Sequence, residues 1–373
     1  MKLIGLEEHF ITPELAQATN DLPAEQVGSF FQLFTGGPVQ ERLLDLGDDR
    51  LRQMDLIGLD MTVLSTPAPG VELLAPAPAV ALARQANDRL AAAVRAHPDR
   101  YAAFAAVPTP DPAAAVAELQ RAVQELGCCG ALINGRTADN KYLDHPDFRP
   151  LLAMAAQLGA PLYLHPQMPP AAVRAAYYDG FDPVLSAVFA GGGWGWHLDA
   201  GIGPLRLILS GVFDELPTLQ IVLGHWGEMV TFYLERADVL TAFMAQRGLK
   251  KSLAEYFRQH FHVTGSGINT TAYLLRRGGA GRRPGNVFHR LSLRLRLRRQ
   301  YQERLLALKD ALELVSGKWK FCLLAQALQP RRDALHRLAA AAPVRGGHPG
   351  PRSARPAAGA APWPAGATGG PGR

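Results

Sequence analysis

Residues 161–166 read Pro161-Leu162-Tyr163-Leu164-His165-Pro166, a short apolar run that ends in an imidazole. Continuous apolar runs of this length, bounded by proline or glycine, are typical of strands buried on both faces of a helix-covered parallel sheet. The same pattern recurs through the first 265 residues. It predicts strands over Lys2–Leu6, Met61–Ser65, Tyr101–Val107, Gly130–Asn134, Pro161–His165, Gln220–Gly224 and Phe261–Thr264.

Amphipathic stretches separate these runs and predict helices, for example over Ala79–Ala96 and Asp111–Leu126. The second has Pro112 in its first turn, where a missing N–H costs nothing, and Gly127 just past its end. Alternating strands and helices with seven recognisable strands predict an α/β fold, a (β/α)8 TIM barrel. Its last strand and C-terminal helices are expected to be missing or replaced.

Charge divides the 373-residue chain into two parts. Residues 1–275 hold 19 Lys and Arg against 29 Asp and Glu, whereas residues 276–373 hold 20 against 4. The first part is long enough for one α/β barrel. No apolar run approaches the roughly 20 residues of a membrane span, and the N-terminus lacks a signal-peptide pattern. We therefore expect a cytoplasmic protein without a membrane contact.

Acidic and imidazole side chains gather at the predicted carboxyl ends of three strands, where TIM barrels place their active sites. Glu7 and His9 follow the first strand and share one face by alternation, His165 ends the fifth, and His225 and Glu228 follow the sixth. A single histidine there is often only structural. Three imidazoles with a carboxylate predict a divalent-cation site.

Three ordered blocks in these regions resemble one known family. They are Gly5-Leu6-Glu7-Glu8-His9-Phe10, Tyr163-Leu164-His165-Pro166 and Ile221-Val222-Leu223-Gly224-His225-Trp226-Gly227-Glu228. Together they are similar to the amidohydrolase-superfamily decarboxylases, which include the γ-resorcylate, 2,3-dihydroxybenzoate and aminocarboxymuconate-semialdehyde decarboxylases. The resemblance covers residues 1–275. The opening Glu-x-His favours the hydroxybenzoate side of that family.

The resemblance implies one divalent metal ion, with zinc, manganese and magnesium all compatible. It implies Glu7, His9 and His165 as ligands and His225 and Glu228 as the catalytic pair. Asn134, at the end of the fourth strand, and Arg236, on the helix after the sixth, are the candidate substrate-binding residues, although an arginine at such a place is more often a surface or ion-pair residue. The implied reaction is nonoxidative decarboxylation of a hydroxybenzoate or related unsaturated acid. The alternative is metal-dependent hydrolysis of an amide or lactone. The expected partners are a small aromatic carboxylic acid and further copies of the chain, in a dimer or tetramer.

The chain departs from the family where a Ser-Thr-Asp-Tyr/Trp-Pro motif should supply a fourth ligand. Residues 286–294 read Asn-Val-Phe-His-Arg-Leu-Ser-Leu-Arg, and codons for them can be read one base on as Met-Phe-Ser-Thr-Asp-Tyr-Pro-Tyr. This predicts a shift of reading frame near Leu275–Arg277, and weak activity in the chain as written. The expected segments are an incomplete barrel over 1–275, an out-of-frame basic segment over 276–304, a helical segment over 305–342 and a disordered tail over 343–373.

A stretch over Leu308–Phe321 resembles the opening helices of HxlR-type winged helix-turn-helix regulators, and the alternative is a chance amphipathic helix around Leu305–Leu324. Specific nucleic-acid recognition is not expected. A third hypothesis is a catalytically inactive chain whose basic tail attracts phosphate nonspecifically.

Overall fold

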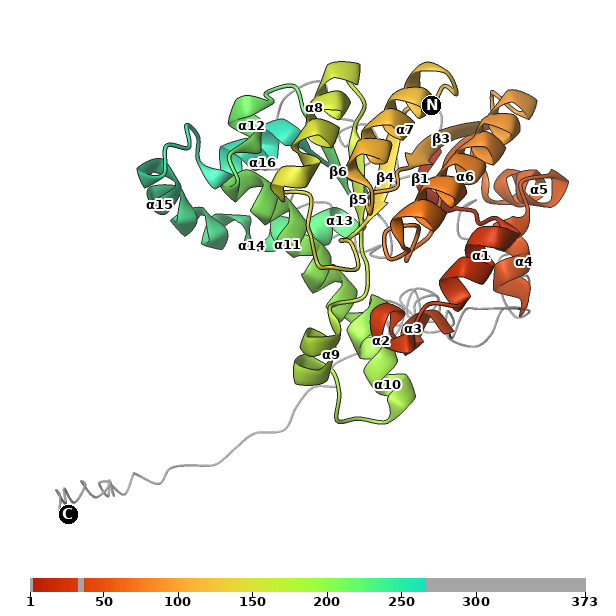
Figure 1. Ribbon diagram of the computed structural model, residues 1–373, viewed down its shortest axis with the longest axis horizontal. Coiled ribbons are helices and arrows are strands. Elements are labelled where there is room, and N and C mark those ends of the chain that lie inside the picture. The colour runs from red at the N-terminus through yellow and green to blue at the C-terminus, as the bar shows by residue number, and fades with distance from the viewer. Residues whose placement is uncertain (1–2, 33–36, 266–373) are drawn as a thin grey trace, which may run out of the picture. The chain divides into compact units, whose positions relative to one another are not determined.

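A computed structural model describes residues 3–32 and 37–265 of the chain. Seven strands pair in parallel and in chain order within this part (Figure 1). The sheet curls, because Glu7 on the first strand lies within hydrogen-bond distance of Tyr163 on the fifth, whereas a flat sheet would separate these strands by roughly 19 Å. The strands are β1 (Ile4–His9), β2 (Met61–Ser65), β3 (Tyr101–Ala106), β4 (Gly130–Asn134), β5 (Leu162–His165), β6 (Ile221–Leu223) and β7 (Phe261–Val263).

Helices occupy the connections between the strands, and α6, α7 and α8 lie over the outer face of β3, β4 and β5 (Figure 1). The first half contains α1 (Pro13–Asn20), α2 (Ala24–Val27), α3 (Ser29–Gln32), α4 (Gly37–Leu44), α5 (Asp48–Ile57), α6 (Pro76–Ala96), α7 (Pro112–Gln124), η1 (Pro146–Phe148) and α8 (Arg149–Leu158). The second half contains α9 (Ala171–Tyr177), α10 (Pro183–Val188), η2 (Phe189–Gly193), α11 (Gly195–Leu209), α12 (Val212–Glu215), α13 (His225–Glu228), α14 (Val230–Ala237), η3 (Asp238–Leu240), α15 (Thr241–Gln246) and α16 (Leu253–His260).

Local chemistry explains where the two predicted helices begin and end. Asp111 is the N-cap of α7, since its carboxylate accepts a hydrogen bond from the Ala114 backbone N–H at 3.0 Å. The helix ends at Gln124, two residues before the predicted end. The start predicted for α6 was wrong by three residues, because Pro76 occupies the first turn without needing a donor.

The apolar core forms two layers on either side of the strands. Alternation sends one set of strand side chains outward against the helices, including Ala131, Ile133, Leu162 and Leu164. The other set fills the inside of the curled sheet, where Val63, Phe104, Leu132, Tyr163 and Val222 pack together. Tyr163 and His165 therefore face inward, and the inner core ends where the polar side chains of the mouth begin.

The predicted end of the first strand, at Leu6, was wrong. β1 continues to His9, and its register against β2 slips between Gly5 and Glu8, so that one extra residue is accommodated as a bulge. Glu7 and His9 therefore lie inside the strand rather than after it. The other six strands agree with the prediction within two residues at each end.

The parallel α/β barrel architecture is confirmed for the described residues. The expected eighth-strand motif and the three segments 276–304, 305–342 and 343–373 lie outside them. None of the described helices has the length and apolarity that crossing a membrane requires.

Candidate active site

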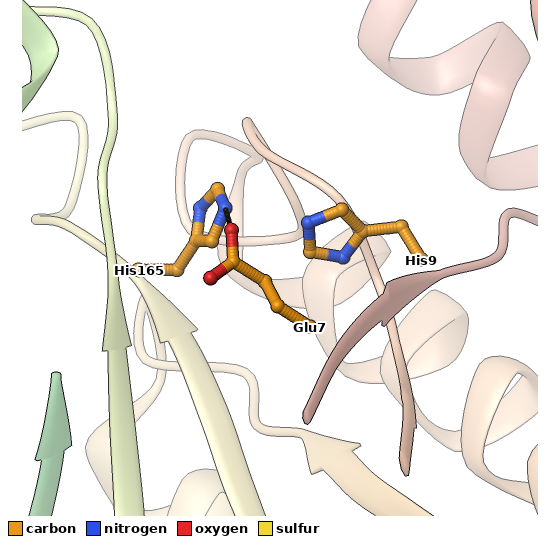
Figure 2. Close-up of side chains that lie close together, drawn as sticks. All are labelled: Glu7, His9 and His165. Carbon is orange, nitrogen blue, oxygen red and sulfur yellow. Dashed lines mark ion pairs between the residues drawn. The ribbon is translucent and has the colours of Figure 1, made fainter. Parts of the chain in front are cut away.

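Glu7, His9 and His165 converge at the carboxyl ends of β1 and β5 (Figure 2). Each offers one potential ligand atom, and these atoms lie within 4.8 Å of one another. The Glu7 Oε1 atom is 3.3 Å from His165 Nε2, and the rings of His9 and His165 meet edge to face with centroids 4.9 Å apart. The structure thus brings together the three residues that the sequence singled out as ligands.

The two imidazoles are prepared for a cation by their other contacts. His165 Nδ1 lies 2.8 Å from the Pro166 carbonyl oxygen, which can only accept, so Nδ1 carries a proton and Nε2 is the nitrogen that faces Glu7. His9 Nδ1 bonds to the Ser65 hydroxyl at 3.1 Å. Burial, followed by repulsion from His165, lowers the pKa of His9 to about 3, so this ring is neutral. A divalent cation binds the free nitrogen of an imidazole whose other nitrogen is held by a hydrogen bond in this way.

Glu7 supplies the negative charge of this group. Burial by itself would raise its pKa, but hydrogen bonds from His165 and His225 outweigh burial and hold the pKa well below the usual range. The Tyr163 hydroxyl donates to Glu7 Oε2 at 2.5 Å, and burial together with the Glu7 charge raises the pKa of Tyr163. One carboxylate with two imidazoles therefore fits a hard or borderline divalent cation.

The turn that carries His225 and Glu228 has an unusual backbone. Five consecutive residues, 225–229, have positive φ values between 43° and 86°, and Gly227 is the only glycine among them. Left-handed conformations cost other residues roughly 1–2 kcal/mol each and concentrate at functional sites. Buried Trp226 anchors the turn, because its backbone N–H donates to the Thr264 carbonyl at 2.8 Å.

This turn places His225 between two carboxylates. Its Nδ1 lies 2.6 Å from Glu228 Oε1, and its Nε2 lies 3.1 Å from Glu7 Oε1. Burial alone would lower the pKa of His225, but the bonds to Glu228 and Glu7 outweigh it and raise the pKa to about 10. Burial alone would raise the pKa of Glu228, but the hydrogen bonds from His197 and His225 outweigh it and lower the pKa. His225 is thus an imidazolium beside the ligand group.

Sequence reasoning missed His197, near the start of α11. Its Nδ1 lies 2.9 Å from Glu228 Oε2, and it forms a second group of potential ligands with His225 and Glu228. The predicted strand ends could not reveal it, because it comes from a helix. The histidine after the glycine-rich stretch 191–195 was the one available signal.

The remaining predicted residues occupy different places. Asn134 alternates with Leu132 on the inner face of β4 and pairs in register with His165, so it lies at the level of the site, fully buried. Arg236 is exposed on α14 and makes no hydrogen bond or ion pair within residues 3–32 and 37–265. The structure therefore places Asn134 at the level of the ligand group and Arg236 on the exposed face of α14.

A further buried acid, Glu72, contacts Asn134 from the loop after β2. Its Oε1 accepts the Asn134 backbone N–H at 2.7 Å, and the residue is 1% exposed. Burial raises the pKa of Glu72 to about 8, against the smaller effect of that hydrogen bond. At neutral pH its carboxyl is therefore mostly protonated.

The curled parallel sheet, with potential ligands at the carboxyl ends of its strands, is of the amidohydrolase type. The family model described as "Amidohydrolase" matches residues 44–306, and the chain belongs to this family.

Within the family, the chain is similar to aromatic acid decarboxylases. It is 38% identical to the γ-resorcylate decarboxylase of Rhizobium sp., over 73% of this chain and 82% of the relative. Two solved structures agree. A 2,6-dihydroxybenzoate decarboxylase in complex with 2,6-dihydroxybenzoate has a TM-score of 0.62 at 38% identity, covering 74% of this chain and 83% of that one. A dihydroxybenzoic acid decarboxylase from Polaromonas sp., with bound manganese and 2-nitroresorcinol, has a TM-score of 0.63 at 36% identity, covering 74% and 82%.

These comparisons confirm the resemblance to amidohydrolase-superfamily decarboxylases. The relatives named here are carboxy-lyases, and one of their structures holds manganese. The hydrolase alternative is not favoured by them.

Proposed function

We propose that this chain is a metal-dependent, nonoxidative decarboxylase of a hydroxybenzoate or closely related aromatic acid. The observation that carries the proposal is the arrangement of Glu7, His9 and His165 opposite the His225 ring, with 3.1 Å between Glu7 Oε1 and His225 Nε2. A ligand group and a proton donor then face the same small space. The similarity to decarboxylases with bound 2,6-dihydroxybenzoate or 2-nitroresorcinol supports an ortho-hydroxylated substrate.

Glu7, His9 and His165 are the residues that would hold the metal ion. A divalent cation there would act as a Lewis acid that stabilises negative charge on the substrate's carboxylate and phenolate oxygens. Zinc, manganese and magnesium all suit the donors, and the manganese in the Polaromonas relative makes manganese the first to test.

The protein's own contribution centres on His225. Glu228 takes the Nδ1 hydrogen bond, so the ring presents Nε2–H to the mouth. We assign this group to orienting the substrate and delivering a proton to the ring carbon that bears the carboxylate. The bond from that carbon to the carboxylate then breaks, its electrons return to the ring, and CO2 leaves as aromaticity is restored. The buried carboxylate of Glu228 keeps the imidazole in position throughout.

Asn134 and Arg236 are proposed as substrate-binding residues. Asn134 is supported by its place on the inner face of β4, next to His165. Arg236 is exposed on α14 and is proposed to attract the substrate carboxylate. Arg236→Gln should raise KM severalfold with little change in kcat, since an attracting charge acts on binding.

The test of the function uses manganese-loaded protein and 2,6-dihydroxybenzoate labelled with carbon-13 in the carboxyl group. Release of labelled CO2 that disappears in the His225→Leu variant supports the proposal. Absence of CO2 with a panel of hydroxybenzoates, alongside opening of a lactone, would establish the hydrolase alternative instead.

We further propose that residues after about 275 are read out of frame, with the Ser-Thr-Asp-Tyr-Pro motif encoded across residues 288–293 and a regulator-like stretch at 308–321. The support is the one-base re-reading of residues 286–294 and the change in charge at residue 275. Nucleotide sequencing of codons 270–300 decides this: the idea fails if no single insertion or deletion restores the motif. The frame-restored protein should decarboxylate faster than the present chain, because it regains a fourth ligand.

A homo-oligomer, dimer or tetramer, is proposed as the assembled form. Large apolar side chains are exposed side by side in sequence on α14, η3 and α15, and exposed apolar groups of this kind often mark protein–protein contacts. They are Phe232 at 66%, Tyr233 at 55%, Val239 at 66% and Phe243 at 62%. Light scattering should give a mass of at least two chains, and the mass should fall to that of a single chain in a Phe232→Glu, Phe243→Glu double variant. An unchanged mass in this variant would contradict the assignment of this surface as the contact between copies.

A further inference from the structure

The carboxylate of Glu228 accepts hydrogen bonds from two imidazoles rather than one. His225 Nδ1 lies 2.6 Å from Oε1, and His197 Nδ1 lies 2.9 Å from Oε2. The Glu228 side chain is 0% exposed, whereas that of His197 is 23% exposed. Because an ionised carboxylate only accepts hydrogen bonds, both Nδ1 atoms must carry protons. Both Glu228 oxygens are thus directed, one toward each ring.

The backbone of α11 is arranged to bring His197 to this position. Gly201 lies one helical turn after His197, on the same face of α11. A Cβ atom at Gly201 would lie only 2.6 Å from the Glu228 carbonyl oxygen. The absence of a side chain at residue 201 therefore lets the helix approach the left-handed turn closely enough for His197 to reach Glu228.

A carboxylate with a single partner can rotate about its side-chain bonds, and burial leaves water little room to hold its second oxygen. His225 and His197 approach opposite oxygens, and their ring centroids are 4.6 Å apart. Fixing Oε2 therefore also fixes Oε1, and with it the orientation of the His225 ring whose Nε2 faces Glu7. Partners that orient such a ring from behind commonly change activity by roughly 10–100-fold.

We propose that His197 is a positioning residue of the decarboxylase site, acting through Glu228 to hold the His225 ring with Nδ1 protonated and Nε2 toward the substrate. The inference rests on the proposed function for its kinetic consequence. Its structural consequence, the state of the His225 Nδ1–H···Glu228 hydrogen bond, is independent of that function.

Two variants of nearly equal size separate this role from simple space filling. His197→Asn places an amide N–H at the same number of bonds from Cα as Nδ1, so it can still donate to Oε2. His197→Leu has a similar shape and no donor. If both variants fold, their melting temperatures should lie within a few degrees of each other. If the Leu variant does not fold, the Asn variant can still be compared with the original chain.

The direct readout is the low-field proton resonance of His225 Nδ1–H, assigned by its loss in His225→Leu and measured on nitrogen-15 histidine-labelled protein. We expect it in the original chain and in His197→Asn, and we expect broadening and faster solvent exchange in His197→Leu. With active protein, kcat should fall at least roughly 10-fold in the Leu variant and recover in the Asn variant, with KM little changed.

Two results would overturn the proposal. One is an unaltered His225 resonance in His197→Leu. The other is an Asn variant that behaves like the Leu variant, since hydrogen-bond donation would then not be what matters. A chain that decarboxylates nothing would refute the proposed function, while the resonance measurement would still decide the role of His197.

Discussion

Replacing Glu72 by Gln should make the protein more stable at alkaline pH and leave it unchanged near pH 4.5. Burial raises the pKa of Glu72 to about 8, whereas an accessible Glu in the unfolded chain has the ordinary value of 4.5. Between these values the folded protein holds a proton that the unfolded chain has released. Stability must therefore fall as pH rises from 4.5 to 8, and become flat above 8.

The difference between the two pKa values sets the magnitude. At about 1.4 kcal/mol per pKa unit, a rise from 4.5 to about 8 has a ceiling of about 5 kcal/mol. Local opening and water entry reduce this, and we expect about 2 kcal/mol or more at pH 8.5. Gln keeps an oxygen to accept the Asn134 N–H, which lies 2.7 Å from Glu72 Oε1, and it remains neutral at every pH.

The assay is urea unfolding followed by tryptophan fluorescence at pH 5, 7 and 8.5. Glu41→Gln is the matched control, because it makes the same substitution at an exposed helical residue. The free energy of unfolding of Glu72→Gln should exceed that of the original chain increasingly as pH rises. Parallel pH profiles for Glu72→Gln and the original chain would refute the argument from burial.

Two further predictions concern the ligand group and the helix behind it. Glu7→Gln should weaken manganese binding by at least roughly 10-fold in calorimetry, whereas Glu8→Gln should change it little, and equal losses would contradict the assigned ligand set. Gly201→Ala should destabilise the fold by about 1–3 kcal/mol, because its Cβ would lie 2.6 Å from the Glu228 carbonyl oxygen. Gly203→Ala, whose Cβ would first meet a neighbour at 3.9 Å, should be neutral or stabilising in the same thermal melts.

Much of the fold was predictable because buried parallel strands have a recognisable sequence pattern, a short continuous apolar run. Six strands were placed within two residues at each end on that basis. The predicted end of the first strand was wrong because the second half of that strand is acidic and polar, a composition that is typical of loops. A bulge after Gly5 allows that polar half to remain in the sheet with Glu7 turned into the mouth.

The residues of the candidate site also include some that the sequence predicted and some that it did not. Strand ends predicted a cation site from Glu7, His9, His165 and His225, because the carboxyl ends of parallel strands meet at one edge. The pairing of Glu228 with His225 came from the resemblance to a known family. His197 and Glu72 were not, since neither follows a strand directly. His197 reaches the site only because α11 packs against the turn at 225–229. Glu72 reaches it only because the loop after β2 packs against β4.

The sequence by itself therefore determined the strand order, the sheet type and the chemical groups at the mouth, since these follow from local hydrophobic patterns and from the geometry of parallel strands. The tertiary structure decided how those groups are ionised and oriented. The pKa of His225 rises to about 10 only because the curled sheet and a left-handed turn place two carboxylates within 3.1 Å of its ring. Such charges act over a few ångströms, a distance that connects residues from β1, α11 and α13 and that no single segment of the chain contains.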